Sequence, residues 1–420
     1  MGETVELKGG SALRRNRAFQ RLVVAKVSNE LSSAIGNVAL PLIVLGVTAS
    51  ATLAGLVLFA SNAALIATQA FGGALVDRHS PSLVLRLSSF TQASGWALAL
   101  LAIFFPEPGM LPVLILGAAL AGAASGLDGP SEQALVKVIV PRGQLGQAAA
   151  VSQGREAGAG LVGGPIGGLL YSLGGAWALG TQVALNAVAG IFTPRPSRVA
   201  EYESSPSGYI AQLREGFVFV WRQPGLRGVA IVAGLANLPI IVLPLTLIAY
   251  YQKSGEAPVA IGILATAFGA GVVAGALMAG TLSSRFRLGR LGGTALAAFA
   301  LGQAMVVFTY PSLPLTVVVL FLSALPLPAF NAAISAYTVT VTPAPLMGRV
   351  TAASGVPGML LMPVGALGGG LLFDHFGPFV PLVFSATVAI ATVVVMVSSK
   401  DLRRIPRLGE LSEDGLEVPG

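Results

Sequence analysis

Charged residues are scarce in this chain, and their scarcity excludes most soluble folds. Of its 420 residues, 10% are Asp, Glu, Lys or Arg and 54% are hydrophobic, whereas a soluble domain carries roughly 25% charged residues. A bilayer core of roughly 30 Å requires about 20 apolar residues for each helix that crosses it. Charge-poor runs of that length recur from Leu22 nearly to Val397. The sequence therefore predicts an all-α integral membrane protein.

Cysteine is absent and histidine is rare, which removes several kinds of site. Without cysteine the chain has neither disulfides nor thiolate metal ligands. The two histidines, His79 and His375, lie far apart in short predicted loops, so no metal site is expected. A Gly-x-x-x-x-Gly-Lys-Ser/Thr phosphate loop is also missing. We therefore expect no cofactor, no enzyme activity and no ATP-driven step, and we expect an ion gradient, most simply of protons, to supply the energy.

Apolar runs separated by charge, Gly or Pro predict twelve transmembrane helices in two pseudo-symmetric six-helix bundles. The expected spans are 20–47, 52–76, 83–104, 111–132, 146–171 and 175–193, followed by 226–251, 259–282, 291–310, 314–336, 351–372 and 379–398. The polar stretch between them ends in a predicted amphipathic surface helix near 209–221. The expected organisation is an N-terminal bundle over 1–193, a cytoplasmic linker over 194–224, a C-terminal bundle over 225–398 and a cytoplasmic tail over 399–420.

The positive charges predict the orientation. All but three of the 25 Lys and Arg residues fall on one side of the predicted spans. Lys26 and Arg155 lie inside spans, and Lys253 is alone on the other side. Because Lys and Arg concentrate in cytoplasmic loops, both termini are expected in the cytoplasm. This topology accounts for the net charge of +7, so the expected partners are the lipid bilayer and a small molecule, not a nucleic acid.

The two halves repeat each other at an offset of about 200 residues, the pattern of alternating-access transporters. Val-Pro-Arg-Gly-Gln-Leu-Gly-Gln at 140–147 precedes a Gly-Pro-Ile-Gly-Gly helix, and Pro-Ala-Pro-Leu-Met-Gly-Arg at 343–349 precedes Pro-Val-Gly-Ala-Leu-Gly-Gly. Residues 73–78 are likewise mirrored by 280–285. Transporters of this kind place the substrate site between the halves.

Several motifs resemble the major facilitator superfamily, and within it the bacterial macrolide-efflux-like and enterobactin-exporter-like branch. Gly73-Ala-Leu-Val-Asp77-Arg78 is similar to the superfamily's loop motif between helices 2 and 3. The stretch from Gly160 through Gly164, Pro165 and Gly168 is similar to the helix-5 motif of its antiporters. Branch-level similarity is strongest at 129–135, 213–227 and 348–350. The resemblance implies a multi-pass protein of a bacterial inner membrane, and the chain is expected to be monomeric.

The resemblance also implies conformational gating by these motifs. Asp77 is expected to cap the N-terminus of helix 11 from a membrane-surface loop, with Gly73, Arg78 and Arg349 in the same gating set. Gly160, Gly164 and Gly168 are expected to form one smooth stripe around Pro165, a close contact between the halves. Simple tight packing is the alternative reading of that stripe. The chain departs from the family pattern after Arg78 and at Ser284, where the first-half copy has Asp77.

Charges inside the predicted helices are the sharpest signal. Lys26, Glu30, Ser33 and Asn37 share one face of helix 1 by their spacing, and Arg155 with Glu156 lies well inside helix 5. A charge at a helix centre costs roughly 2.5–3.5 kcal/mol to insert, so these groups are expected to face the bundle interior. Two interpretations remain open: a structural ion network such as Glu30 with Arg155, or a carboxylate that carries the coupling proton. Glu30 is favoured over Glu156, and Asp128, expected near the cytoplasmic end of helix 4, is a third candidate.

The second half has no ionisable residue inside a predicted span, since Lys253, Glu256, Asp374 and His375 fall in predicted outer loops. Its candidate cavity wall is mostly apolar and, together with Asn37 of helix 1, comprises Asn237, Tyr250, Phe330 and Asn331. Taken singly, each of these side chains is more often ordinary packing. The leading hypothesis is a secondary active transporter, a proton-coupled multidrug-type efflux antiporter of hydrophobic or amphiphilic compounds. The alternative is a facilitator or importer of a small polar metabolite, which would ordinarily need polar groups on both walls.

Overall fold

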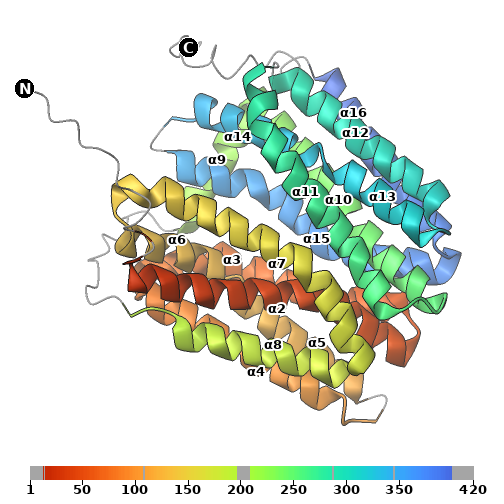
Figure 1. The fold of residues 1–420 in the computed structure, drawn as a ribbon. Coiled ribbons are helices and arrows are strands. Elements are labelled where there is room, and N and C mark those ends of the chain that lie inside the picture. Colours follow the sequence, from red (N-terminus) through yellow and green to blue (C-terminus); the bar gives the residue numbers. More distant parts are fainter. Residues whose placement is uncertain are drawn as a thin grey trace, which may run out of the picture. The chain divides into compact units, whose positions relative to one another are not determined.

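The fold is known from a computed structural model that describes residues 13, 15–106, 109–195, 209–285, 288–343 and 346–399. Within these ranges the regular structure is helical, without strands (Figure 1). The helices of the first half are α2 (Arg17–Thr48), α3 (Ala51–Arg78), α4 (Pro81–Ala102), α5 (Met110–Ser125), α6 (Asp128–Ile139), α7 (Leu145–Leu173) and α8 (Gly175–Phe192). Those that follow are α9 (Tyr209–Arg222), α10 (Pro224–Lys253), α11 (Pro258–Arg285), α12 (Leu288–Thr309), α13 (Leu313–Ala324), α14 (Leu327–Val341), α15 (Met347–Phe376) and α16 (Phe379–Ser398).

Ten stretches of the described chain are long and apolar enough to cross a membrane. In that number α5 with α6 counts as one span, Met110–Ile139, and α13 with α14 as another, Leu313–Val341. Helices α4 and α7 have 22 and 29 residues, long enough to span, but are more polar. With these two included, the number of spans is consistent with the expected twelve, and the all-α membrane fold class is confirmed.

Two of the spans are interrupted at positions that prolines explain. A proline has no N–H to donate, and its ring clashes with the carbonyl four residues earlier in a helix. Pro130 stands four residues after Gly126, where α5 gives way to α6, and Pro328 stands four after Ala324, where α13 ends. The sequence predicts an end near residue 132 for the fourth span, whereas α6 continues to Ile139. That boundary was wrong because Glu132 is paired inside the protein and does not mark the membrane surface.

The described residues form two compact units. Unit 1 is drawn from 1–37, 60–163 and 173–206, and unit 2 from 38–59, 164–172 and 207–420. The ends of α2, α3 and α7 thus pack with the second-half helices of unit 2. The predicted bundles over 1–193 and 225–398, the linker over 194–224 and the tail from 399 stay predictions, and residues 196–208 and 400–420 lie outside the described part of the chain.

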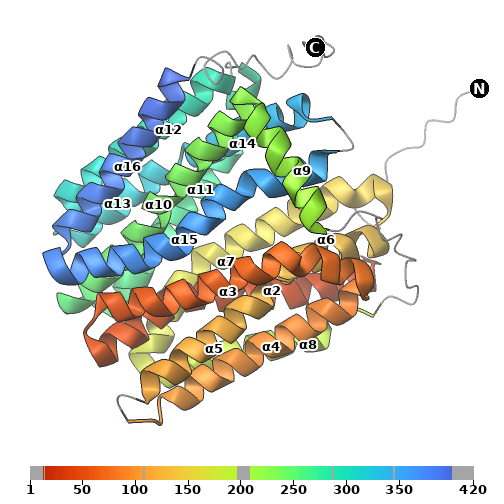
Figure 2. The same ribbon diagram turned by 180° about the vertical axis from the view of Figure 1, so that it is seen from behind.

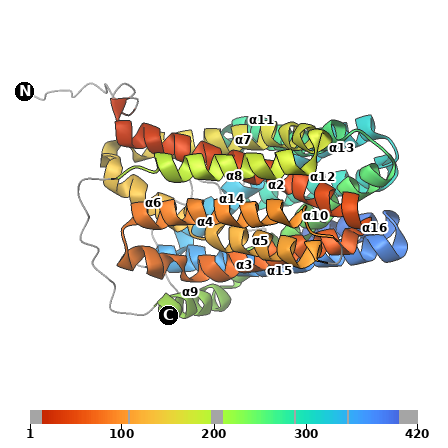
Figure 3. The ribbon, with the colours of Figure 1, turned by 90° about the horizontal axis from the view of Figure 1, so that it is seen from below.

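Small residues let helices approach closely within each unit, as expected for packing in lipid. In unit 1, α4 lies beside α5 and α8 (Figure 2). A Cβ placed on Gly95 of α4 would lie 2.7 Å from the carbonyl oxygen of Gly117 on α5, so the two backbones are in direct contact. In unit 2, α10 lies beside α15 and α16 (Figure 3). These packed helices hold the polar side chains described next.

Candidate functional site

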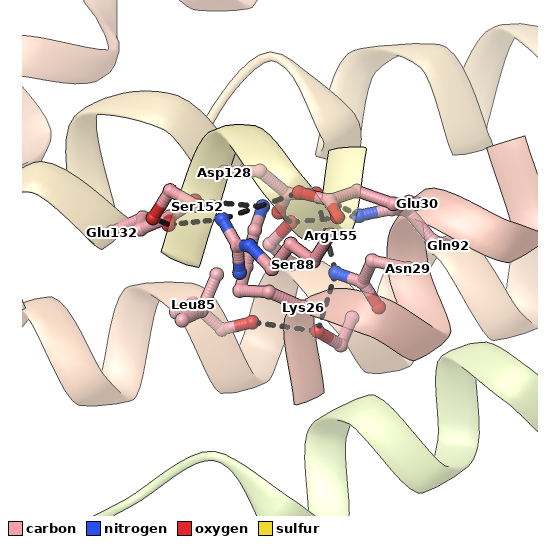
Figure 4. Close-up of polar contacts among 11 residues, drawn as sticks. Lys26, Asn29, Glu30, Leu85, Ser88, Gln92, Asp128, Glu132, Ser152 and Arg155 are labelled. Carbon is pink, nitrogen blue, oxygen red and sulfur yellow. Dashed lines mark hydrogen bonds and ion pairs between the residues drawn. The ribbon is translucent and has the colours of Figure 1, made fainter. Parts of the chain in front are cut away.

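Four charged side chains meet inside unit 1 in a group that we call the Arg155 network. Lys26 and Glu30 come from α2, Glu132 from α6 and Arg155 from α7 (Figure 4). Arg155 Nη2 lies 3.2 Å from Glu30 Oε1 and also contacts Glu132 Oε1. Lys26 Nζ lies 3.3 Å from Glu132 Oε2. The network contains two cations and two carboxylates, so its formal charges cancel.

Helical spacing brings these groups together from three segments of the chain. Lys26 and Glu30 are four residues apart on α2, and Ser152 and Arg155 are three apart on α7. Residues at these spacings share one face of a helix. Ser152 Oγ donates a hydrogen bond of 3.3 Å to Glu132 Oε1, so α7 contributes two donors to the same carboxylate. Glu132 is therefore the centre on which α2 and α7 converge.

Burial makes the pairing necessary. The side chains of Lys26 and Arg155 are 7% and 8% exposed, and those of Glu132 and Glu30 are 15% and 19% exposed. Removing one partner of a buried ion pair typically costs about 3–5 kcal/mol, because the other charge is left uncompensated. The network thus constrains where α2, α6 and α7 can lie relative to one another within unit 1.

The two carboxylates of the network are held unequally. Glu132 has partners on both oxygens, namely Lys26 on Oε2 and Arg155 with Ser152 on Oε1. Glu30 has only Arg155 on Oε1, and its Oε2 is buried with no hydrogen-bond partner among the described residues. A proton added to Oε2 of Glu30 would break one ion pair, whereas protonation of Glu132 would disturb three contacts. Glu30 is consequently the carboxylate better placed to change its charge.

Glu156 lies outside the network although it adjoins Arg155 in sequence. Neighbouring residues of an α-helix point about 100° apart, since a turn holds 3.6 residues. Arg155 faces α2 and α6, while Glu156 is exposed and its side chain has no ion pair or hydrogen bond within the described residues. Ser33 and Asn37, predicted on the face of Lys26 and Glu30, are also exposed.

Asp128 forms a separate polar cluster. Its carboxylate accepts hydrogen bonds from Asn29 Nδ2 at 3.2 Å, Ser88 Oγ at 2.5 Å and Gln92 Nε2 at 3.0 Å, all neutral donors. Asp128 is the first residue of α6, at the interruption inside the span Met110–Ile139, and not near the end of that span as predicted. These bonds join the interruption to α2 and α4. We therefore assign Asp128 a structural part.

Glu132 is the residue of the Arg155 network that sequence reasoning missed. The predicted end of the fourth span near residue 132 placed it at the membrane surface, where a glutamate needs no partner. A usable signal was present, because Asp128 and Glu132 are four residues apart and share a helix face. This spacing is informative only when the helix is known to continue beyond Pro130.

No group of three or more His, Asp or Glu residues that could hold a metal ion occurs in the part of the chain that the structure describes. The acidic residues nearest to such a group, Glu30 and Glu132, are each already paired with cationic side chains.

The residues predicted to line a cavity in the second half have different surroundings. Asn237 Nδ2 packs against Gly358 of α15, where a Cβ would lie 2.3 Å from it. Tyr250 makes edge-on ring contacts with Tyr251 and Tyr310 at centroid distances of 5.2 and 4.9 Å. Phe330 is 4% exposed inside an apolar cluster, so the structure does not place it on an accessible wall. Asn331 is exposed.

Gly164 and Gly168 of α7 lie against the backbone of α11 in unit 2, a contact that we call the α7–α11 seam. A Cβ on Gly164 would lie 2.4 Å from the carbonyl oxygen of Gly262, and one on Gly168 would lie 2.1 Å from that of Pro258. Pro165 is accommodated inside α7 without breaking it. Gly160, predicted to extend the stripe, has open space around it. The tight contact is therefore limited to the last part of α7.

A matching contact joins α3 to α15, and we call it the α3–α15 seam. A Cβ on Gly55 would lie 2.5 Å from the carbonyl oxygen of Ala366, and one on Gly370 would lie 2.2 Å from that of Ala51. The sequence Gly168-Leu-Leu-Tyr-Ser172 at the first seam corresponds to Gly370-Leu-Leu-Phe-Asp374 at the second. The two seams thus repeat each other, except that Ser172 stands where the second has Asp374.

Asp374 fastens the α3–α15 seam. Its carboxylate accepts hydrogen bonds from Ser50 Oγ at 2.7 Å, Ala51 N at 3.0 Å and Thr52 N at 2.8 Å, which lie at the first turn of α3. Lys253 Nζ at the end of α10 lies 3.4 Å away. An anion is stabilised at a helix N-terminus by the free amides and the helix dipole. The sequence predicts a loop for Asp374, whereas it lies in the last turn of α15, and this position aims it at α3.

Replacing Asp374 by asparagine is expected to loosen this seam. Such caps and charges contribute about 1–2 kcal/mol, so opening of the seam should become roughly 5–30 times more frequent. The chain has no cysteine of its own, so a single cysteine at Ala54, which is 0% exposed on α3, reports opening through its rate of maleimide labelling. Glu256→Gln removes an exposed carboxylate near the same end and should leave the rate unchanged. Equal rates in both variants would contradict this assignment.

Residues 73–78, the first gating motif, form the last turns of α3, at the end of the second helix where the sequence places them. The side chains of Asp77 and Arg78, and the surroundings of Gly73, lie outside the described residues. Arg349, in the first turn of α15, is paired through Nη1 with Glu215 of α9 at 2.5 Å.

The sequence corresponds to a known family. The sequence profile of the Major Facilitator Superfamily matches residues 22–256 and 240–414. The chain belongs to the major facilitator superfamily. Members of this superfamily are membrane transporters, and the expectations of a membrane transporter and of no enzyme activity agree with this membership.

Two relatives of similar sequence are named as exporters. The chain is 28% identical over 354 residues to the enterobactin exporter EntS of Shigella boydii, and the aligned region covers 81% of each chain. It is 26% identical over 417 residues to the enterobactin exporter EntS of Citrobacter koseri, with 94% of each chain covered. These matches agree with the predicted resemblance to enterobactin exporters.

Solved structures of the superfamily share the fold. A bacterial homologue of the iron transporter ferroportin in its inward-facing state superposes with a TM-score of 0.71 over 91% of this chain and 98% of its own, at 14% identity. The nucleoside transporter NupG superposes with the same TM-score over 91% of this chain and 99% of its own, also at 14% identity. At such identities the likeness concerns the fold alone.

Proposed function

We propose that this chain is a proton-coupled antiporter that exports hydrophobic or amphiphilic small molecules by alternating access. The observation that carries the proposal is the shared arginine: Arg155 is bound between Glu30 and Glu132, with Glu30 Oε2 buried and unpartnered among the described residues. An ion pair that can exchange its charge for a proton is what coupling requires. Relatives named as exporters support the direction of transport.

The coupling step uses side chains of this chain alone. In the paired state Glu30 is ionised and shares Arg155 with Glu132. When a proton binds Oε2 of Glu30, the Glu30–Arg155 attraction is lost and Arg155 is retained by Glu132. The link between α2 and α7 then weakens, while that between α6 and α7 stays. Release of the proton to the other side of the membrane restores the pair, so one proton moves for each cycle.

The proposed substrates follow from the relatives and from the apolar second half. The relatives are named enterobactin exporters, so siderophore-like amphiphiles are the first compounds to test, with lipophilic dyes and drugs beside them. Described helices α10 to α16 of unit 2 expose few charged side chains along their length, which suits an apolar ligand. The distribution of Lys and Arg supports a bacterial inner-membrane location with cytoplasmic termini.

Inverted membrane vesicles test this function directly. With an acid interior, the protein should concentrate an amphiphilic dye or a siderophore inside the vesicles, and an uncoupler should abolish that accumulation. Vesicles without the protein give the background. Accumulation that continues at full rate with the uncoupler would contradict proton coupling, and binding without accumulation of any compound would contradict export.

A further inference from the structure

One face of helix α9 packs against other helices of unit 2. Its Gly216 lies so close to α15 that a Cβ would be 2.2 Å from the carbonyl oxygen of Arg349. Val220, which is 1% exposed, packs in an apolar cluster with Leu226 of α10 and Val350 of α15. Figure 2 shows that α9 crosses α15 and does not run parallel to it. The helix is thus fixed to its unit through a narrow stripe.

The other face of α9 is apolar, aromatic and exposed. Phe217, Val218 and Trp221 are 41%, 39% and 45% exposed. The rings of Phe217 and Trp221 are stacked, with centroids 5.3 Å apart and planes inclined by 16°. Arg214 is also exposed. It precedes Phe217, Val218 and Trp221 by three, four and seven residues, so it lies on the same face of the helix. Arg222, also exposed, lies at the border of this face. We call this face the α9 outer face.

The depth of α9 along the helices agrees with the edge of the membrane. It contacts α15 at Arg349, in the first turn of that helix, where Arg349 and the exposed Glu215 form an ion pair that marks a polar level at this end of α15. A helix that lies in the plane of the interface buries its apolar face about 5–10 Å into the boundary of headgroups and acyl chains. The α9 outer face therefore stands at headgroup level and not in the hydrocarbon core.

From this arrangement we propose that the α9 outer face is a docking surface for anionic phospholipid at the bilayer interface. Aromatic side chains with an apolar body and a polar edge occupy this depth preferentially. Arg214 and Arg222 supply cations where a lipid phosphate or an anionic headgroup would lie. Charge complementarity favours a lipid over a second copy of this chain. A second copy docked through the same face would bring its two arginines close to these two, whereas an anionic lipid neutralises them.

The bound lipid would act on the start of α15. Glu215 lies beside the α9 outer face and is paired with Arg349 at 2.5 Å. Gly216 adds the backbone contact to the same residue. Any tilt of α9 on the lipid surface is consequently transmitted to the first turn of α15, the helix whose far end carries Asp374. Helix α9 thus acts as a lipid sensor, and this action does not depend on which substrate is carried.

Quenching of Trp221 by brominated lipids tests the docking surface in the full chain. The protein has three tryptophans, and replacing Trp96 and Trp177 by phenylalanine leaves Trp221 as the only reporter. In reconstituted vesicles, brominated phosphatidylglycerol in phosphatidylcholine is compared with brominated phosphatidylcholine in phosphatidylglycerol. We expect quenching by both, with a preference of about fivefold for the anionic lipid, the factor for roughly one arginine–anion contact.

Matched variants separate lipid binding from general surface charge. Arg214→Gln should reduce the preference toward one, whereas Arg290→Gln, which removes an exposed arginine at the start of α12, should keep it. If the double tryptophan replacement does not fold, the difference between wild-type protein and Trp221→Phe gives the same quantity. Absence of quenching, quenching without preference, or a Trp221 signal that changes with protein concentration as two copies associate would each overturn the proposal.

Discussion

Replacing Glu30 by glutamine is expected to reduce proton-driven accumulation to the level of vesicles without the protein. Glutamine keeps the size and an oxygen that can still accept from Arg155, but it cannot bind and release a proton. Arg155 keeps its ion pair with Glu132 and can still donate to the glutamine oxygen, so the fold should persist although the network gains one positive charge. Substrate exchange across the membrane with no gradient, which needs no net proton movement, should continue near the wild-type rate. The measurement is therefore the ratio of driven accumulation to exchange.

Glu156→Gln is the matched comparison for Glu30. It removes a carboxylate from the next residue after Arg155, but one that is exposed and has no ion pair within the described residues. We expect this variant to keep driven accumulation within about twofold of wild type, as is usual for changes away from a paired site. Wild-type accumulation in Glu30→Gln, or equal loss in both variants, would show that the Arg155 network is not the coupling site.

Replacing Gly168 by alanine is expected to lower transport at least about fivefold, because forced overpacking costs about 1–3 kcal/mol. The added Cβ would lie 2.1 Å from the backbone oxygen of Pro258, which cannot turn away as a flexible side chain could. The seam would have to separate, and a cycle that requires its closure would slow. Gly164→Ala, with 2.4 Å to the oxygen of Gly262, should act in the same direction.

Gly160→Ala isolates the effect of the seam from that of losing a glycine. It lies on the same helix, but a Cβ there meets nothing within 4 Å. Alanine favours a helix over glycine by about 1 kcal/mol, and this gain is common to all three variants. Transport by Gly160→Ala should stay within twofold of wild type. If Gly160→Ala is as slow as Gly168→Ala, close backbone contact is not what the motif provides.

The membrane class and the approximate positions of the helices were predictable from the sequence. A bilayer demands that every stretch crossing it be apolar and internally hydrogen-bonded, a condition that each segment must meet by itself. The composition of each segment therefore indicates whether that segment can cross the membrane. The same local cost indicated that Lys26, Glu30 and Arg155 should be inside the protein, and all three belong to the Arg155 network.

The partners of those charges, in contrast, were settled by the tertiary structure. Glu132 joins Lys26 and Arg155 from a helix that the sequence ended too early, and Glu156 is left out because neighbouring helical residues point apart. The burial of Phe330 and the hydrogen bonds of Asp374 to the start of α3 are equally non-local. The sequence by itself thus determined which residues pay a cost in lipid, since that cost belongs to each side chain. The groups that offset this cost lie on helices that are distant in sequence and become adjacent only after folding.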